Sequence, residues 1–206
     1  MTPADQLTQI IQGRRSIRHY DDTPIPADIL EAVIDAARWA PSPHHALPFR
    51  FALITGAEPK GRLAAAMGAS WESDLTRDGV PATVIAREIA KSHDRLVHGG
   101  AIVIGCIYVE PLDEYPDAER QSAEHTMAAH ALGAAMQNVM LSAHAHGLGS
   151  SWMCAPLFCP ETVRSALELP DAWIPHGLLT VGYPAQGEQS ALGSRPPIDS
   201  ILIRRP

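Results

Sequence analysis

The sequence predicts an α+β protein, and three observations lead to this fold class. The chain has 206 residues, of which 46% are hydrophobic and 19% charged, and this composition is typical of a globular protein. Helical patterns cover most of its length. A few short apolar strands occur between the helices, but not in the regular alternation of a doubly wound fold. No linker or repeat divides the chain, so we expect one domain over residues 1–206 with a C-terminal arm from about 184 to 206.

Capping and breaking residues delimit the elements in the first half of the chain. Thr2 suits the N-cap of a first helix, and Gly13 lies just past its end. Pro26 suits the first position of a second helix, and Pro41 stops it. We therefore predict helices over 3–12, 26–40, 59–73 and 81–97, and a buried strand over 49–55.

Glycines delimit the elements of the second half. Gly99 and Gly100 precede an apolar strand, and Gly147 ends the longest helical pattern of the chain. The tail from Pro184 onward is rich in Pro and Gly. The predicted strands are 101–109, 150–153 and 177–181, and the predicted helices are 118–145 and 160–167.

The longest predicted helix is almost free of charge. No Asp, Glu, Lys or Arg occurs from His125 to Pro160. A transmembrane span is one interpretation of such a gap. The many small residues, interspersed with histidines and amides, favour a helix that protein surrounds on all sides. We therefore expect no membrane partner.

Charge and cysteine content exclude several classes of function. A net charge of -7 and a pI near 5.8 argue against binding to nucleic acid or an anionic membrane. Cys106, Cys154 and Cys159 are too few for a disulfide framework, and the N-terminus lacks a signal-peptide pattern. We therefore expect a cytoplasmic protein. No second cysteine pair accompanies Cys154 and Cys159, so we expect no metal site.

The common catalytic motifs are missing. The sequence has no G-x-G-x-x-G, no Walker loop and no G-x-S-x-G elbow. Instead, three of its sixteen basic residues lie in the segment Arg14-Arg15-Ser16-Ile17-Arg18. Guanidinium groups and a hydroxyl suit the oxygens of a phosphate. The alternative is a solvated basic turn that pairs with Asp21 and Asp22.

Two further segments have the composition of ligand-binding loops. Residues 40–51 read APSPHHALPFRF, a proline-bracketed loop between a helix and a strand. Residues 147–156 read GLGSSWMCAP, in which glycines allow a ligand to approach the backbone closely. For residues 40–51, the alternative is a plain connector.

These three segments, in this order, resemble the nitroreductase family of FMN-dependent oxidoreductases. The resemblance runs from Arg14 to Arg195. Within the family the sequence is most similar to the FMN-binding domain of the two-domain enzymes of coenzyme F-420 biosynthesis, through APSPHHALPFRF, SWESDLTRDGVP, EYPDAER and LGSSWM. The resemblance implies a mainly antiparallel central sheet flanked by helices, and an intertwined homodimer with two FMN sites at its interface. A monomer with a central helix is the alternative.

The resemblance also assigns roles to residues. The FMN phosphate and ribityl chain would be held by Arg14, Arg15, Ser16, Ile17 and Arg18, with Arg195 returning from the tail. The second subunit would bring Ser42, Pro43, His44 and His45 to the flavin. The ring would lie against Trp152, Met153, Cys154 and Ala155. Asp74 falls where the F-420 enzymes contact their deazaflavin, and His44 or His45 is a candidate proton donor for catalysis.

The function implied is hydride transfer from reduced FMN to a conjugated acceptor, such as the C=C bond of the dehydro precursor of coenzyme F-420. Reduced nicotinamide or another hydride donor would reduce the flavin again after each turnover. We expect no glutamate-ligase domain in this chain. Two alternatives remain open: a broad-specificity NAD(P)H nitroreductase or quinone reductase, and a non-catalytic module that binds flavin or deazaflavin.

Overall fold

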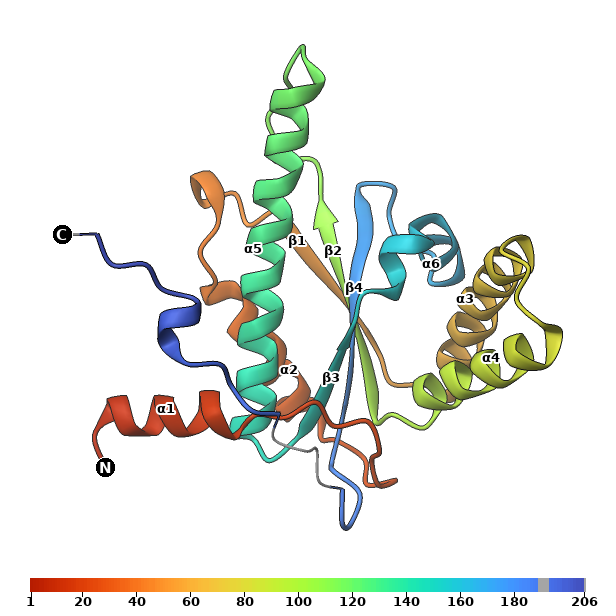
Figure 1. The fold of residues 1–206 in the computed structure, drawn as a ribbon, viewed down its shortest axis with the longest axis horizontal. Coiled ribbons are helices and arrows are strands. Elements are labelled where there is room, and N and C mark those ends of the chain that lie inside the picture. The colour runs from red at the N-terminus through yellow and green to blue at the C-terminus, as the bar shows by residue number, and fades with distance from the viewer. Residues whose placement is uncertain (189–192, 206) are drawn as a thin grey trace.

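A four-stranded antiparallel sheet forms the centre of the protein, seen here in a computed structural model that describes residues 1–188 and 193–205 (Figure 1). The strand order is β1-β2-β4-β3, so β1 and β3 are the edges. The strands are β1 (Phe49–Ile54), β2 (Ala101–Tyr108), β3 (Gly149–Met153) and β4 (Trp173–Gly182). The predicted α+β fold with an antiparallel sheet is confirmed.

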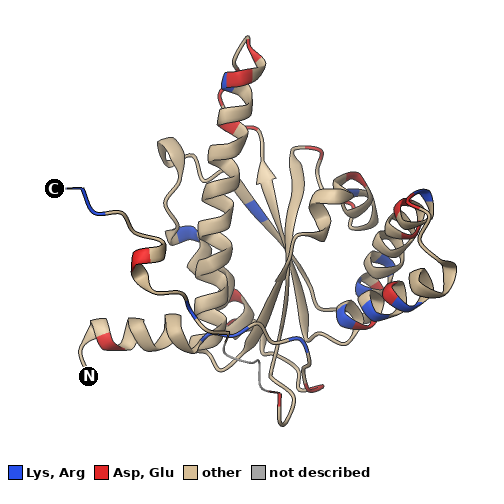
Figure 2. Ribbon diagram, viewed as in Figure 1, with Lys and Arg blue, Asp and Glu red and all other residues tan. Residues whose placement is uncertain are grey.

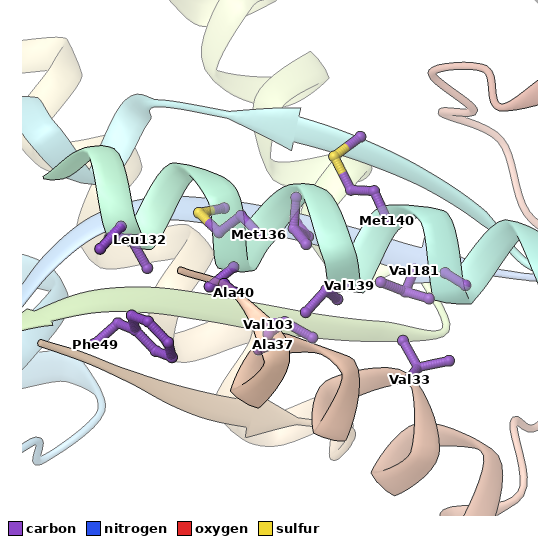
Figure 3. Packing of buried hydrophobic residues seen from close by; sticks show 14 of the residues in the cluster. Val33, Ala37, Ala40, Phe49, Val103, Leu132, Met136, Val139, Met140 and Val181 are labelled. Carbon is purple, nitrogen blue, oxygen red and sulfur yellow. The ribbon is translucent and has the colours of Figure 1, made fainter. Parts of the chain in front are cut away.

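One face of the sheet packs against the long helix α5 (Ala118–Ala145) and, beside it, α2 (Ala27–Asp35) with the 3-10 turn η1 (Ala36–Trp39). Figure 3 shows Leu132, Met136 and Val139 of α5 in this cluster, close to Phe49 and Val103 of the sheet. Glycines let the helix approach closely. A Cβ at Gly177 would lie 2.8 Å from the Met136 methyl carbon.

The other face carries α3 (Ala57–Arg77), α4 (Ala82–Val97) and α6 (Pro160–Ala166). Leu63, Leu96 and Val163 from these helices meet Ile104 and Leu178 of the sheet. The outer halves of α3 and α4 extend beyond the sheet as a pair (Figure 1). That extension leaves room between the helix pair and the end of β3.

The N-terminal helix α1 (Pro3–Gly13) contains no buried residue and contacts the C-terminal end of α5. Short 3-10 turns complete the fold: η2 (Pro43–His45), η3 (Ala155–Phe158) and η4 (Ile198–Ser200). Most of α5 is free of charged residues, which gather on α3, α4 and the tip of α5 (Figure 2). None of the helices in the described ranges is long and apolar enough to cross a membrane.

The predicted bounds hold closely for most elements, with several differences. The predicted second helix does not continue to residue 40: α2 ends at Asp35, and the chain continues as the 3-10 turn η1 to Trp39. Gly13 is the last residue of α1 rather than the residue after it, and Pro26 is the N-cap of α2 rather than its first residue. Helix α3 continues beyond residue 73 to the turn at Gly79, whose φ is 75°. Strand β4 begins at Trp173, four residues before the predicted start at 177.

Candidate functional site

The arginine-rich segment lies against the free edge of β3. Ser16 and Ser150 form an isolated parallel bridge, in which the N–H of Ile17 donates to the Ser150 carbonyl oxygen at 3.0 Å. The Ile17 side chain is buried and packs on Gly149, where a Cβ would lie 2.6 Å from the Cβ of Ile17. Ile17 therefore anchors the segment, and its charged neighbours remain at the surface of the site.

Arg14 is a half-buried cation, and one of its guanidinium nitrogens has no partner in the described ranges. Its Nη1 is inaccessible to solvent and makes no hydrogen bond there. Burial lowers its pKa, and the positive charges of Arg15 and Arg195 lower it further. The tail thus brings Arg195 within electrostatic reach of Arg14. Like charges repel and buried donors need acceptors, so this arrangement favours binding of an anion.

The guanidinium of Arg15 is turned toward its own backbone. Its Nη1 donates to the Arg14 carbonyl oxygen at 2.8 Å. A small cavity of about 210 Å³ lies beside Arg14 and Arg15, between the ends of α1 and α5 and the start of β3. The hydroxyl of Ser150 on its wall is also buried without a hydrogen bond to any described residue.

Arg18 lines a second hollow, of about 130 Å³, farther along the same edge of β3. Arg95 from the last turn of α4 lines it from the opposite side, with Ser151 and Trp152 between them. Two cations therefore converge on the strand edge beyond Ser150. This hollow suits the polar, electron-rich edge of a planar ring.

Strand alternation places the side chains of Trp152 and Met153 on opposite faces of the sheet. Trp152 lies over Gly177 on the α5 face, where a Cβ would be 3.1 Å from the indole Nε1, whereas Met153 packs with the cluster on the α3–α4 face. The two residues can thus meet one ligand only at the strand edge. Because β3 is an edge strand, main-chain groups beyond Ser150 are available to that ligand.

A third cavity, of about 670 Å³, lies between α3, α4 and the segment after β3. Met153, Cys154 and Ala155 line one side of it. Asp74 lines the other side and forms an ion pair with Arg77 at 3.0 Å. The structure therefore brings the predicted substrate residue and three of the four predicted ring-lining residues to one cavity, whereas Trp152 lines the hollow beside Arg18. Arg95 lines both this cavity and the hollow beside Arg18.

The loop from Ser42 to His45 lies elsewhere. None of its residues lines the three cavities described above. In Figure 1 the loop (orange) and the α3–α4 pair lie on opposite sides of α5. His44 and His45 are exposed and have positive φ values of 52° and 55°, and Ser42 Oγ accepts a hydrogen bond from the Leu47 N–H at 3.1 Å. Within one chain, this loop and the arginine segment do not meet.

Two residues of the site, Arg95 and Tyr20, could not be assigned to it from the sequence. Arg95 is one basic residue among several on α4, and only the packing of α4 beside β3 brings it to Arg18. The hydroxyl of Tyr20 lies 2.6 Å from the Ile17 carbonyl oxygen and 2.8 Å from Thr180 Oγ1, so it ties the arginine segment to β4. Burial raises the pKa of Tyr20 to about 12, so its hydroxyl stays protonated.

Comparisons with known proteins match this architecture. An NADH dehydrogenase of Thermus thermophilus is 28% identical, over 93% of this chain and 92% of that protein. A protein of Desulfovibrio desulfuricans, described as a nitroreductase in complex with FMN, has a TM-score of 0.73 at 25% identity, with 100% of this chain and 98% of that chain covered. A BluB-like flavoprotein of Clostridium difficile has a TM-score of 0.79 at 20% identity, covering 97% and 98%.

The match to a family model is as extensive as these pairwise similarities. It spans residues 11–183, from the last turn of α1 to the residue after β4, and so contains both the arginine segment and the β3 edge. On this evidence the chain belongs to the nitroreductase family.

Proposed function

We propose that this protein, an FMN-dependent oxidoreductase of the nitroreductase family, transfers a hydride from reduced FMN to a conjugated acceptor held in the 670 Å³ cavity. One observation carries the proposal. Arg14, with a buried and unpartnered Nη1 among the described residues, lies beside Arg15 and within reach of Arg195, at the start of a strand edge that leads into that cavity.

The residues present fit FMN. A phosphate would satisfy the Arg14 guanidinium and relieve its repulsion with Arg15 and Arg195. The ribityl chain and ring would then follow the β3 edge toward Arg18 and Arg95. The positive charges of these two arginines would stabilise negative charge on the edge of the ring that faces them. When bound, FMN supplies the hydride chemistry, and no side-chain nucleophile is required.

The cavity beyond the strand edge would hold donor and acceptor in turn. Met67, Trp71 and Met153 give it apolar walls that exclude water from the reacting faces, while Asp74 supplies a hydrogen-bond acceptor. The names of relatives such as the NADH dehydrogenase of T. thermophilus support a reduced nicotinamide as the donor. His44 or His45 of a second subunit would deliver the proton that completes reduction.

For the acceptor, we propose the C=C bond of the dehydro precursor of coenzyme F-420. The similarity of residues 70–81 to the F-420 enzymes supports it, as does the position of Asp74 on the cavity wall. A broad-specificity NAD(P)H nitroreductase is the second candidate. The 25% identity to a methanogen protein named NADH dehydrogenase/NAD(P)H nitroreductase favours that candidate.

The first experiment measures FMN binding to the wild type and to the R14A/R18A double variant by flavin fluorescence. Each lost charge-assisted hydrogen bond is worth about 1.5–3 kcal/mol, so we expect the variant to bind at least about a hundredfold more weakly. Arg62→Ala is the matched control, because Arg62 is exposed, pairs with Glu58 on α3 and lines none of the three cavities described above. Equal affinity of wild type and double variant would refute the phosphate assignment.

The second experiment identifies the acceptor. The FMN-loaded protein is bleached with NADH or NADPH, and reoxidation is followed with the dehydro F-420 precursor, a nitrofuran and a quinone. We expect the precursor to reoxidise the flavin fastest. Faster reoxidation by the nitrofuran and the quinone would instead establish the broad-specificity reductase. A flavin that no acceptor reoxidises under exclusion of oxygen would indicate a binding module.

A further inference from the structure

A histidine from another element, His144, also lines the small cavity beside Arg14. Its lining contains three titratable groups: Arg14, Arg15 and His144. The remaining lining residues are Gly13, Ile17, the segment 147–150 and Pro184, all of them uncharged. Among the described residues, any charge that enters this 210 Å³ space therefore interacts with two guanidinium groups and one imidazole at its walls, and with Arg195, which lies within electrostatic reach of Arg14.

The geometry directs the imidazole of His144 to the start of the arginine segment. His144 lies in the last turn of α5, where α1 crosses that helix. A Cβ placed on Gly13 would lie 2.6 Å from His144 Nε2, so the imidazole directly faces Gly13. Nε2 therefore lies next to the residue that precedes Arg14, on the same cavity wall.

Burial and the surrounding charges lower the pKa of His144 below its usual value. Burial is the main cause of its lowered pKa, and the positive charges of Arg14 and Arg15 lower the pKa further. The last turn of α1 has no basic residue, and β3 contributes the uncharged hydroxyl of Ser150. The C-terminal end of α5 favours a cation, but this weaker effect does not offset burial and two like charges.

We propose that His144 is a further phosphate ligand of the site, and that it takes up a proton when the phosphate group of FMN enters between it and Arg14. The proposal rests on the proposed function, because it assumes that the arginine segment holds that phosphate. A phosphomonoester carries a charge near -2 at neutral pH. It offsets the guanidinium charges and gives Nε2–H an acceptor, and both changes favour the imidazolium form.

Proton uptake couples FMN affinity to pH. The pKa of His144 is higher in the FMN-bound protein than in the free protein. The extra affinity is therefore complete below the pKa of the free protein, and it is lost as the pH rises through the pKa of the bound protein. The phosphate of FMN itself protonates near about pH 6, so the informative range lies above that value.

The test compares three proteins: the wild type, His144→Gln and the matched control His146→Gln. His146 follows at the same end of α5 but is exposed, and its Nδ1 lies 2.8 Å from the Ser142 carbonyl oxygen, outside the cavity. FMN affinity is measured by fluorescence from about pH 6.5 to about pH 8.5. Calorimetry in buffers of different ionisation enthalpy measures proton uptake, and riboflavin, which lacks the phosphate, serves as the control ligand.

We expect wild type and His146→Gln to bind FMN more tightly as the pH falls and to take up a proton. His144→Gln should lose most of this dependence and bind about tenfold more weakly near pH 6.5. Riboflavin affinity should be the same for all three proteins. If His144→Gln keeps the wild-type pH dependence and proton uptake, the inference is wrong while the FMN site stands. If the wild type itself binds no FMN, the proposed function fails first.

Discussion

At the scale of single residues, the site depends on how a few side chains hold the arginine segment in place. Tyr20 is the main anchor. Its hydroxyl has one proton to donate to a main-chain oxygen, either of Ile17 or of Thr180, and it can accept from Thr180 Oγ1. Because Thr180 lies in the buried strand β4, this contact transmits the rigidity of the sheet to the segment that carries Arg18.

We predict that Tyr20→Phe weakens both stability and FMN binding. The substitution leaves the ring in place but removes the hydroxyl, which costs about 1–3 kcal/mol of unfolding free energy because buried oxygens lose their partner. Chemical denaturation measures this loss, and fluorescence titration measures FMN affinity. Tyr183→Phe is the control, because Tyr183 accepts a hydrogen bond from the Asp21 N–H through its main-chain oxygen, which the substitution leaves in place. If Tyr20→Phe matches that control in both assays, the hydroxyl does not position the segment.

At the scale of elements, the contact between the arginine segment and β3 sets the geometry of the site. Residues 16–17 continue the sheet outward from Ser150 for one bridge only, and Gly149 lets Ile17 lie directly on the strand. That single bridge leaves the rest of the β3 edge available to a ligand. A longer pairing would cover the strand edge beside Arg18 and Trp152, and no pairing would leave Arg14 without a fixed position.

We predict that Gly149→Ala separates the segment from β3. The new Cβ would lie 2.6 Å from the Cβ of Ile17, a distance that forces the backbone to move, and small-to-large changes of this kind cost about 1–3 kcal/mol. FMN affinity should fall together with the melting temperature. Gly61→Ala on α3 is the control: nothing lies near its Cβ position, so it should gain about 0.5–1 kcal/mol. Wild-type FMN affinity in Gly149→Ala would contradict the bridge as the determinant of the site.

The sequence predicted those elements whose ends carry local signals. Helix α5 has the predicted bounds because Asp117 caps its start and Gly147, with a φ of 77°, follows its end. The first half of β4 was missed because Pro175 argues against a central strand. The fold accommodates this proline where β3 does not reach it and where the β2–β4 register shifts at Gly105/Cys106.

In the site, too, residues that lie together in the sequence were predicted, and residues that only the fold brings together were not. Arg14 to Arg18 are contiguous, so their chemistry was visible in the sequence. Arg95 and His144 join them only through the packing of α4 beside β3 and of α1 across α5. No period or motif encodes such contacts. The left-handed conformations of His44, His45 and Leu47 were equally hidden, because non-glycine residues rarely adopt them.

At the scale of the whole molecule, one chain does not bring the predicted site together. The loop 42–45 and the arginine segment lie apart, and large apolar side chains remain exposed on several segments. These include Ile11 on α1, Trp39 beside the loop, and Ile201 and Ile203 near the C-terminus, which extends away from the sheet in Figure 1. Exposed apolar surface of this kind indicates a protein partner. We therefore propose the homodimer, in which the loop of one subunit reaches the arginine segment of the other.

Complementation between two inactive variants tests this assembly. R14A/R18A disables the phosphate side of a site, and H44A/H45A disables the loop side. In a dimer with shared sites, a mixed dimer has one site with both defects and one site with neither. We therefore predict that coexpression of the two variants restores about half of the wild-type FMN content per dimer.

Two differently tagged chains allow the mixed dimer to be purified and its bound FMN to be counted by absorbance. Each variant alone, purified in the same way, provides the baseline. If the loop acted within its own chain, every site in the mixed dimer would carry one defect, and no FMN would be regained. If the FMN content of the mixed dimer stays at the baseline, the loop of the second subunit is not part of the site. The arginine segment and the β3 edge would then remain the cofactor-binding surface of each chain.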